Sequence, residues 1–259
     1  MILIHPTATV DPKAEIGEGV EIGPYSVIEK GVSVGEGTKI GPHVVIREGT
    51  EIGKGCQVFQ FASIGEAPQF SGYRGEKTFL QIGDHNIIRE FVTLHRGTVK
   101  GGGKTVIGND NFIMAYSHVA HDCQIGSQVV LANGATLAGH ILIEDYAIIG
   151  GLSAIHQFCR VGAHAIIGGL TGVLLDIPPY TKAQGDRARL FGLNTIGLKR
   201  ANFSGETLKA LKKAYRIFFR SGLTLQKAIK QIGEDEISRF PEVQHLLHFV
   251  KQSKRGITR

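Results

Sequence analysis

Tryptophan is absent from this 259-residue chain, and only two methionines and three cysteines are present. No run of about 18 apolar residues occurs, so no membrane span is expected. The segment Met1 to Pro6 lacks the basic and apolar regions of a signal peptide. An odd number of cysteines without disulfide-framework spacing fits free thiols in a reducing compartment. These absences together predict a cytoplasmic protein.

Charged residues are also few, at 20%, whereas 35 residues are glycine. This balance fits a turn-rich, repetitive fold better than a helical bundle. The net charge of +6 is unevenly placed, because residues 178–259 hold 17 Lys and Arg but only 6 Asp and Glu. Such a basic region indicates an acidic partner, for which nucleic acid is the usual first guess. The alternative is a solvated helical face without a partner.

An aliphatic residue recurs every six positions over most of the chain. One series runs from Ile4 to Ile64 and resumes at Ile82. A second series, one residue out of phase, runs through 12 consecutive positions from Ile107 to Val173. Glycine often follows the aliphatic residue, as in Ile167-Gly168. Chance does not produce such a run, so the repeat organises the fold.

Hexapeptide periodicity is typical of a parallel β-helix, and neither the helical period of 3.6 nor the strand period of 2 explains it. Each hexad predicts one short strand and a corner, with the aliphatic residue pointing inward. Three hexads close a triangular coil, so residues 18 apart stack about 4.8 Å apart. The left hand is taken from the resemblance to known hexapeptide-repeat proteins, because the general crossover rule favours the right hand. We therefore expect an all-β left-handed parallel β-helix.

Two segments interrupt the repeat. They comprise residues 65–81 and residues 95–106, the second of which contains Gly101-Gly102-Gly103. Loops that leave a rigid scaffold often carry binding function.

The six-residue period stops after Pro178-Pro179-Tyr180. Ser204 is a candidate N-cap for a helix that ends near Ser221, with Gly222 as its stop. A second helix is expected from Thr224, and a third has Pro241 in its first turn. Their apolar faces need a partner, and the open end of the β-helix offers one. We expect a β-helix domain at 1–190 and a C-terminal α-helical domain at 191–259.

Polar residues gather on one predicted corner. Adding 18 to His121 gives Gly139 and then Gln157, and adding 18 to Asp122 gives His140. Adding 18 to Ala138 likewise gives His156. Together with His118, the corner therefore gathers four histidines, a carboxylate and a glutamine. Such a cluster favours a general base with an orienting carboxylate.

A metal site is the alternative. His118, His121 and His140, with Cys123 or Cys159, would offer zinc-type ligands. One class of carbonic anhydrase also uses a left-handed β-helix with histidines from neighbouring subunits. The carboxylate beside His121 favours the base, so no metal is expected.

Several segments closely resemble the family of acyl-[acyl-carrier-protein]–UDP-N-acetylglucosamine O-acyltransferases, over nearly the whole chain. The segments are Ser117-His118-Val119-Ala120-His121-Asp122-Cys123, Leu137-Ala138-Gly139-His140, Ile155-His156-Gln157-Phe158-Cys159, Asp176-Ile177-Pro178-Pro179-Tyr180, Gly197-Leu198-Lys199-Arg200 and Leu94-His95-Arg96-Gly97-Thr98. The resemblance implies transfer of an (R)-3-hydroxyacyl group from acyl carrier protein to the 3-position of UDP-N-acetylglucosamine, the first step of lipid A biosynthesis. It also implies a homotrimer with shared sites and no cofactor.

The resemblance assigns roles to individual residues. His121 is implied as general base, Asp122 as its orienting group and the Gly139 N–H as oxyanion donor. His118, His140, His156 and Gln157 are implied to position the sugar and acyl groups. Diphosphate binding is implied for Asn194 and Arg200. Gly169 is implied to select the acyl length. Gly169 lies 18 residues after Gly151, so stacked glycines leave a trough that favours a long acyl chain. The basic C-terminal region then suits acyl carrier protein, and no nucleic acid partner is expected.

One stretch departs from the family pattern. Members carry an acidic residue and a lysine in a Gln-Asp-x-Lys-Tyr-like stretch, whereas this chain reads Gln69-Phe70-Ser71-Gly72-Tyr73. Either another residue such as Arg74 replaces the lysine, or the acceptor differs. N-acylation of the 3-amino analogue of the sugar nucleotide therefore stays open as an alternative.

Overall fold

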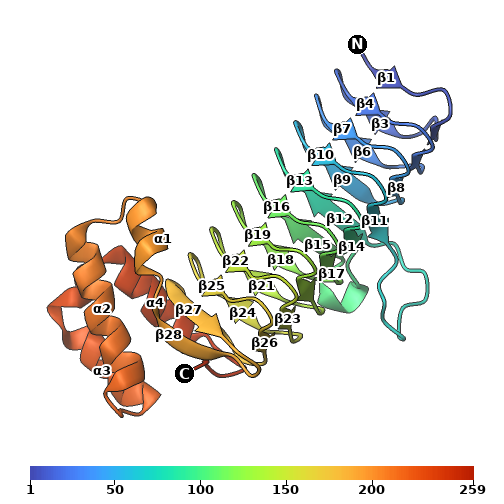
Figure 1. Ribbon diagram of the computed structural model, residues 1–259. Helices are drawn as coiled ribbons and strands as arrows, with labels where there is room; N and C mark the ends of the chain where they lie inside the picture. The colour runs from blue at the N-terminus through green and yellow to red at the C-terminus, as the bar shows by residue number, and fades with distance from the viewer.

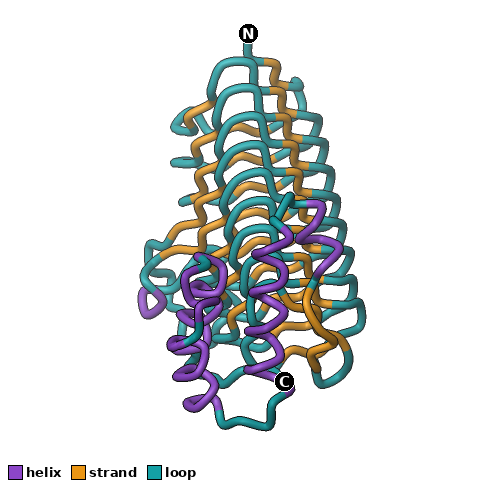
Figure 2. Tube along the Cα trace, turned by 90° about the vertical axis from the view of Figure 1, so that its left-hand side faces the viewer, coloured by secondary structure: helices purple, strands orange, loops and turns teal.

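Short parallel strands wind into a left-handed β-helix, which a computed structural model describes over residues 1–259 (Figure 1). The coils form three sheets, here named A, B and C, and the predicted register of the repeat is confirmed. Before the first loop, strands 18 residues apart pair directly, as Leu3 does with Glu21. The coils are stacked from the N-terminus toward a helical C-terminal region (Figure 2).

Within the β-helix, each sheet contains every third strand in chain order. Sheet A contains β1 (Leu3–Ile4), β4 (Glu21–Ile22), β7 (Lys39–Ile40), β10 (Gln57–Val58), β13 (Ile87–Ile88), β16 (Phe112–Ile113), β19 (Val130–Leu131), β22 (Ile148–Ile149), β25 (Ile166–Ile167), β27 (Thr181–Gln184) and β28 (Arg189–Leu193). Sheet B contains β2 (Thr9–Val10), β5 (Val27–Ile28), β8 (Val45–Ile46), β11 (Ser63–Glu66), β14 (Thr93–His95), β17 (His118–Val119), β20 (Thr136–Leu137), β23 (Ala154–Ile155) and β26 (Gly172–Val173). Sheet C contains β3 (Glu15–Ile16), β6 (Ser33–Val34), β9 (Thr50–Ile52), β12 (Phe79–Ile82), β15 (Lys104–Ile107), β18 (Gln124–Ile125), β21 (Leu142–Ile143) and β24 (Arg160–Val161).

Three corners join the sheets, and we name each by the two sheets it connects. The chain passes from sheet B to sheet C at the BC corner, then to sheet A at the CA corner, and back to sheet B at the AB corner. Many corners hold one residue with positive φ, including Asp122 at +63° and His140 at +61° on the BC corner. Asp and His tolerate this region better than most residues. Sheet A closes the side of the triangle that lies opposite the BC corner.

The aliphatic series fills the interior, because its members point inward from every strand. Ile64, Ile88, Leu94, Val119 and Leu137 are fully buried. This hydrophobic core holds the coils together, while the polar residues of the site lie at a corner.

Two loops leave the coils at the predicted places. The first connects β11 to β12, and the second connects β14 to β15 through the one-turn helix η1 (Val99–Gly101). Both loops emerge at the BC corner, because each runs from sheet B to sheet C.

Helices cover the C-terminal end of the prism (Figures 1 and 2). They are α1 (Thr195–Arg200), α2 (Gly205–Arg220), α3 (Leu225–Glu234), η2 (Glu236–Arg239) and α4 (Pro241–Lys251). The predicted caps Ser204 and Thr224 each accept a backbone N–H bond, and Pro241 is the first residue of α4. The sequence did not predict the antiparallel hairpin β27–β28 or the short α1. No helix has the length and apolarity that crossing a membrane requires.

The helical region packs on the last coils through specific contacts. Arg160 lies over the ring of Phe249, with 4.2 Å to its centroid, and Ile257 pairs with Asp176. The expectation that the helices cover the open end is therefore confirmed. The division at residue 190 stays a prediction, since β28 runs across it.

Candidate active site

His121 and Asp122 form a hydrogen-bonded pair on the BC corner between β17 and β18. Nδ1 of His121 lies 2.7 Å from Oδ2 of Asp122. The Asp122 side chain is fully buried, whereas that of His121 is 14% exposed. With Nδ1 engaged, the other ring nitrogen, Nε2, is the one that can accept a proton. The pair therefore has the arrangement of a general base and its orienting carboxylate.

The stacking predicted for the next coil is confirmed. The His140 N–H donates to the carbonyl of His121 at 3.0 Å, and His140 Nε2 lies 3.5 Å from Asp122 Oδ2. Gly139 lies directly against the His121 ring, because an added Cβ would be 2.7 Å from Cε1 and 2.9 Å from Nε2. The backbone of Gly139 thus reaches the reactive edge of the imidazole only because it carries no side chain.

Two further histidines lie beside this pair on sheet B. His118 Nδ1 is 2.7 Å from Thr93 Oγ1, and its ring meets the ring of His95 edge-on at 4.9 Å between centroids. Burial, with the neighbouring His118, lowers the pKa of His95 to about 4. Burial also lowers the pKa of His118 and, despite the nearby Asp122, that of His140. These three imidazoles are therefore held neutral and suited to hydrogen bonding.

His156 and Gln157 occupy the same corner two coils after His121 and make no hydrogen bond with it. Both side chains are exposed, and His156 Nδ1 is 3.1 Å from the carbonyl of Gln157. The structure thus places them on the same corner as the His121–Asp122 pair but outside its hydrogen bonds.

Asn194 and Arg200 lie elsewhere, at the two ends of α1, beside sheet A. They border a cavity of about 660 Å³, together with residues such as Tyr146 and His164. The Asn194 amide caps α1 by accepting from the Gly197 N–H at 3.1 Å and donates to the carbonyl of His164 at 3.0 Å. Arg200 is exposed and has no ion-pair partner. Within one chain, these two residues are on the opposite side of the prism from His121.

The two glycine columns of the AB corner differ in what they require. A Cβ on Gly150 would lie 2.5 Å from the backbone of Gly168, so close packing demands glycine there. At Gly169 the nearest atom to an added Cβ is the Gly151 carbonyl oxygen at 3.2 Å, and the residue is exposed. Corner geometry therefore explains the first column, whereas in the second a Cβ would fit once the facing carbonyl oxygen moved by a few tenths of an ångström.

The cysteine part of the metal alternative is wrong. Cys123 and Cys159 are fully buried in the core, and the Cys123 thiol donates to the carbonyl of Ala138. The possible ligand atoms of His121, Asp122 and His140 do lie within 4.8 Å of one another. However, two ligands on one tetrahedral zinc are about 3.3 Å apart, given metal–ligand distances near 2.0 Å. The 2.7 Å between His121 and Asp122 fits a shared proton better.

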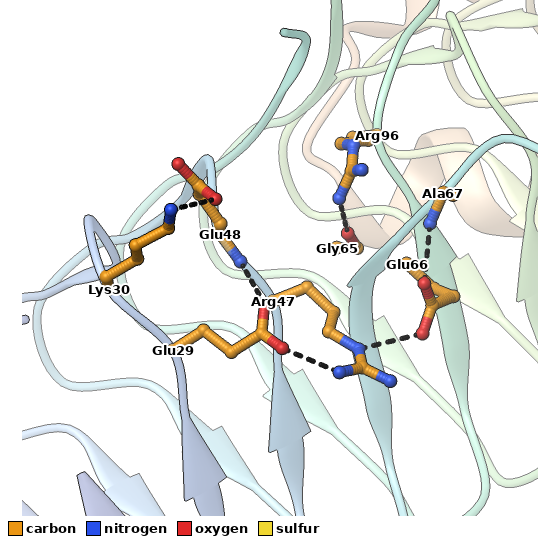
Figure 3. A network of polar contacts seen from close by, with 8 residues as sticks. All are labelled: Glu29, Lys30, Arg47, Glu48, Gly65, Glu66, Ala67 and Arg96. Atoms are coloured by element: carbon orange, nitrogen blue, oxygen red, sulfur yellow. Dashed lines mark hydrogen bonds and ion pairs between the residues drawn. The ribbon is translucent and has the colours of Figure 1, made fainter. Parts of the chain in front are cut away.

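The base of the first loop is fixed by charged residues on the BC corner (Figure 3). Arg47 bridges Glu29 at 2.6 Å and Glu66 at 2.8 Å. Burial alone would raise the pKa of Glu66, but hydrogen bonds from the Ala67 N–H and Arg47 outweigh it and lower that pKa. Arg96 donates to the carbonyl of Gly65 at 3.0 Å, so two arginines anchor the end of the loop that leaves β11.

This loop brings Phe70 to the His121–Asp122 pair, a contact that the repeat could not predict. The Phe70 ring centroid lies 5.8 Å from that of His121. A Cβ on Gly72 would be 2.6 Å from the Phe70 ring, so glycine makes space for the ring. Nη1 of the exposed Arg74 donates to the carbonyls of Ser71 and Tyr73 within the loop, and its replacement of the missing lysine stays a prediction.

Comparisons with known proteins agree with this architecture. A family model described as UDP N-acetylglucosamine O-acyltransferase, domain 2, matches residues 176–258, and one for bacterial transferase hexapeptide repeats matches residues 104–139. The acyl-[acyl-carrier-protein]–UDP-N-acetylglucosamine O-acyltransferase of Thiobacillus denitrificans is 56% identical over 259 residues, which cover 100% of both chains. That of a Janthinobacterium species is 54% identical over 263 residues, again covering 100% of both. The crystal structure of the Moraxella catarrhalis UDP-N-acetylglucosamine O-acyltransferase superposes with a TM-score of 0.96 at 44% identity, covering 99% of each chain.

Proposed function

The chain belongs to the acyl-[acyl-carrier-protein]–UDP-N-acetylglucosamine O-acyltransferase family, and we propose that it catalyses the reaction for which its relatives are named. It transfers an (R)-3-hydroxyacyl group from acyl carrier protein to the 3-hydroxyl of UDP-N-acetylglucosamine, the first step of lipid A biosynthesis. The reaction takes place in the cytoplasm. The observation that carries this proposal is the His121–Asp122 pair with the Gly139 backbone at its reactive edge.

His121 acts as the general base. Its Nε2 removes the proton from the acceptor hydroxyl, while Nδ1 donates to Asp122 and keeps the ring in the correct orientation. The resulting alkoxide attacks the thioester carbonyl, and the Gly139 N–H donates to the oxyanion. This N–H makes no hydrogen bond within the protein, so it is free for that role. Collapse of the intermediate expels the carrier thiolate, which takes the proton back from His121.

The neighbouring side chains position the substrates. His118 and His140 are neutral at physiological pH because burial lowers their pKa values, so they hydrogen-bond without competing as strong bases. His156 and Gln157 extend the same corner toward the sugar nucleotide. Arg200 holds the diphosphate, since a guanidinium fork fits phosphate oxygens, and Asn194 assists with its remaining donor and acceptor.

The separation of these groups supports a homotrimer. Arg200, in α1, lies beside sheet A and His121 on the opposite BC corner, so one chain cannot bring both to one sugar nucleotide. If the BC corner of each subunit faces sheet A of the next, three-fold symmetry completes three identical sites. Each site then lies between two subunits.

Acyl carrier protein is the acidic partner that the basic C-terminal region fits. Lys212 and Arg216 project from the exposed side of α2. Gly169 is exposed and carries no side chain, so the AB corner presents bare backbone there, along which a long acyl chain can lie.

The decisive test offers UDP-N-acetylglucosamine with a panel of (R)-3-hydroxyacyl carrier proteins and detects acylated nucleotide by mass. We expect ester formation in the parent and a loss of at least about 10²–10⁴-fold in His121→Ala. Activity of the variant within tenfold of the parent, in normally folded protein, contradicts the assignment of the base. Acylation only of the 3-amino analogue, giving an amide, establishes the alternative acceptor.

A further inference from the structure

The second loop holds the catalytic carboxylate in place through Thr98. The Thr98 N–H donates to Asp122 Oδ1 at 2.7 Å, and the Thr98 hydroxyl donates to Asp122 Oδ2 at 2.7 Å. Oδ2 is also the atom that binds His121 Nδ1. Thr98 is 24 residues from Asp122 in sequence and does not belong to the hexapeptide series.

The turn at the start of η1 orients the Thr98 hydroxyl toward Asp122. Thr98 is the N-cap of η1, and its oxygen accepts from the Gly101 N–H at 3.1 Å while its hydrogen points to Asp122. A Cβ on Gly101 would collide with the Asp122 carboxyl carbon, so glycine lets the turn close over the carboxylate. In β15, which follows the loop, Thr105 Oγ1 accepts from the Asp122 N–H at 2.8 Å.

These contacts fix both the backbone and the side chain of Asp122. The carboxylate has no exposed surface, so its oxygens depend on protein donors instead of water. A buried carboxylate with one donor missing would rotate or accept a stronger bond from His121. Either change alters where Nε2 points and how readily His121 holds its proton.

We propose that Thr98 is a positioning residue for catalysis, which acts through Asp122 to set the orientation and basicity of His121. This inference rests on the proposed role of His121 as the general base. It gives the second loop a function that the repeat pattern does not reveal. Thr98 does not touch the substrate in this scheme, so its removal should change turnover more than substrate binding.

The test compares Thr98→Val with Thr98→Ser. Valine keeps the size and the backbone N–H but removes the hydroxyl, whereas serine retains the hydroxyl. We expect Thr98→Val to lower kcat about 10–100-fold, with KM for UDP-N-acetylglucosamine changed less than about threefold. Thr98→Ser should remain within about threefold of the parent. The control is Val99→Ala in the same turn, because the Val99 side chain is 62% exposed.

The pH profile gives a second readout. His121 is faced by Asp122 and His140 from the BC corner, by His118 from β17 and by His95 from β14. Thr98→Val removes the donor to Asp122 Oδ2 together with the acceptor of the Gly101 N–H, and loss of the donor leaves more negative charge beside His121. The acid-side half-point of kcat/KM should therefore move to higher pH in Thr98→Val and stay in place in Val99→Ala.

Repeating Thr98→Val in the Asp122→Asn background separates positioning from general damage. If Thr98 acts through Asp122, the added loss in kcat should nearly vanish there. An equal loss in both backgrounds, or a serine variant as impaired as the valine variant, overturns the inference. His121→Ala tests the proposed function separately. If that variant is inactive while Thr98→Val matches the parent in kcat and pH profile, only the positioning inference fails.

Discussion

Gly139→Ala should weaken both the fold and the catalysis, and for a reason specific to His121. The added Cβ would lie 2.7 Å from Cε1 and 2.9 Å from Nε2 of the imidazole. Carbon atoms in contact prefer about 3.5–4.0 Å, so the ring must move by roughly 1 Å. Gly139 does not need glycine for its backbone, because its φ is not positive. The same column holds His121 one coil before and Gln157 one coil after, so the corner itself accepts side chains.

Two magnitudes follow from this collision. Overpacking a filled site typically costs about 1–3 kcal/mol of unfolding free energy. A shift of about 1 Å in a catalytic group costs about 100-fold in rate, although alanine keeps the N–H that we assign to the oxyanion. The variant should therefore fold with a lower denaturant midpoint and turn over about 100-fold more slowly.

A double-mutant cycle with His121→Ala identifies the cause. Removing the imidazole leaves space for the new methyl group, so Gly139→Ala should cost almost nothing in that background. In that background alanine should stabilise the protein by up to about 0.4–1 kcal/mol, because it lowers the conformational entropy of the unfolded chain relative to glycine. The measurement is the denaturant midpoint of the four proteins. An equal destabilisation with and without His121 would show that the corner alone requires glycine, and our reasoning would then be refuted.

Three further predictions concern pH, the carrier protein and acyl length. The pKa of His95 is about 4 in the folded protein against an ordinary 6.5, so between pH 7 and pH 5 the unfolded chain takes up a proton that the folded protein does not. The free energy of unfolding should therefore fall by roughly 2 kcal/mol over this range. His95→Gln should flatten this dependence in denaturation midpoints, and an unchanged slope contradicts it. Lys212→Glu and Arg216→Glu should raise KM for acyl carrier protein several-fold and reduce its salt dependence, without affecting KM for the nucleotide. Lys213 is a poor choice because it pairs with Asp235 at 2.7 Å. Gly169→Met should shift the optimum on a donor panel to a shorter chain, by about tenfold per two methylenes, whereas an equal loss on all donors refutes the groove.

The hexapeptide period predicted the coils and the stacking of the catalytic residues because it has a fixed spacing. Once residues 18 apart are neighbours, the proximity of Asp122 and His140 follows by counting. The caps Ser204 and Thr224 were equally predictable, since an N-cap is a local signal. Resemblance, and not spacing, supplied the role of Gly139.

The remaining features depend on chain segments without a period. Phe70 and Thr98 reach His121 and Asp122 from loops whose paths no spacing rule fixes. His95 entered the sequence analysis only as part of a segment that resembles the family. Nothing in its local sequence shows that its ring contacts the ring of His118. Asn194 was expected to bind diphosphate, yet its amide also caps α1, a helix too short to show a pattern.

The placement of Arg200 and His121 on opposite sides of the prism leads to a complementation experiment. If every active site combines His121 from one subunit with Arg200 from its neighbour, chains carrying His121→Ala and chains carrying Arg200→Ala should each be nearly inactive alone. In trimers assembled randomly from equal amounts of the two, about one site in four receives both intact residues, because the two contributions are independent. Mixed trimers made by coexpression should thus recover up to about a quarter of the parent activity. If the mixture is no more active than the separate variants, the two residues serve the same subunit, and the shared site has to be abandoned.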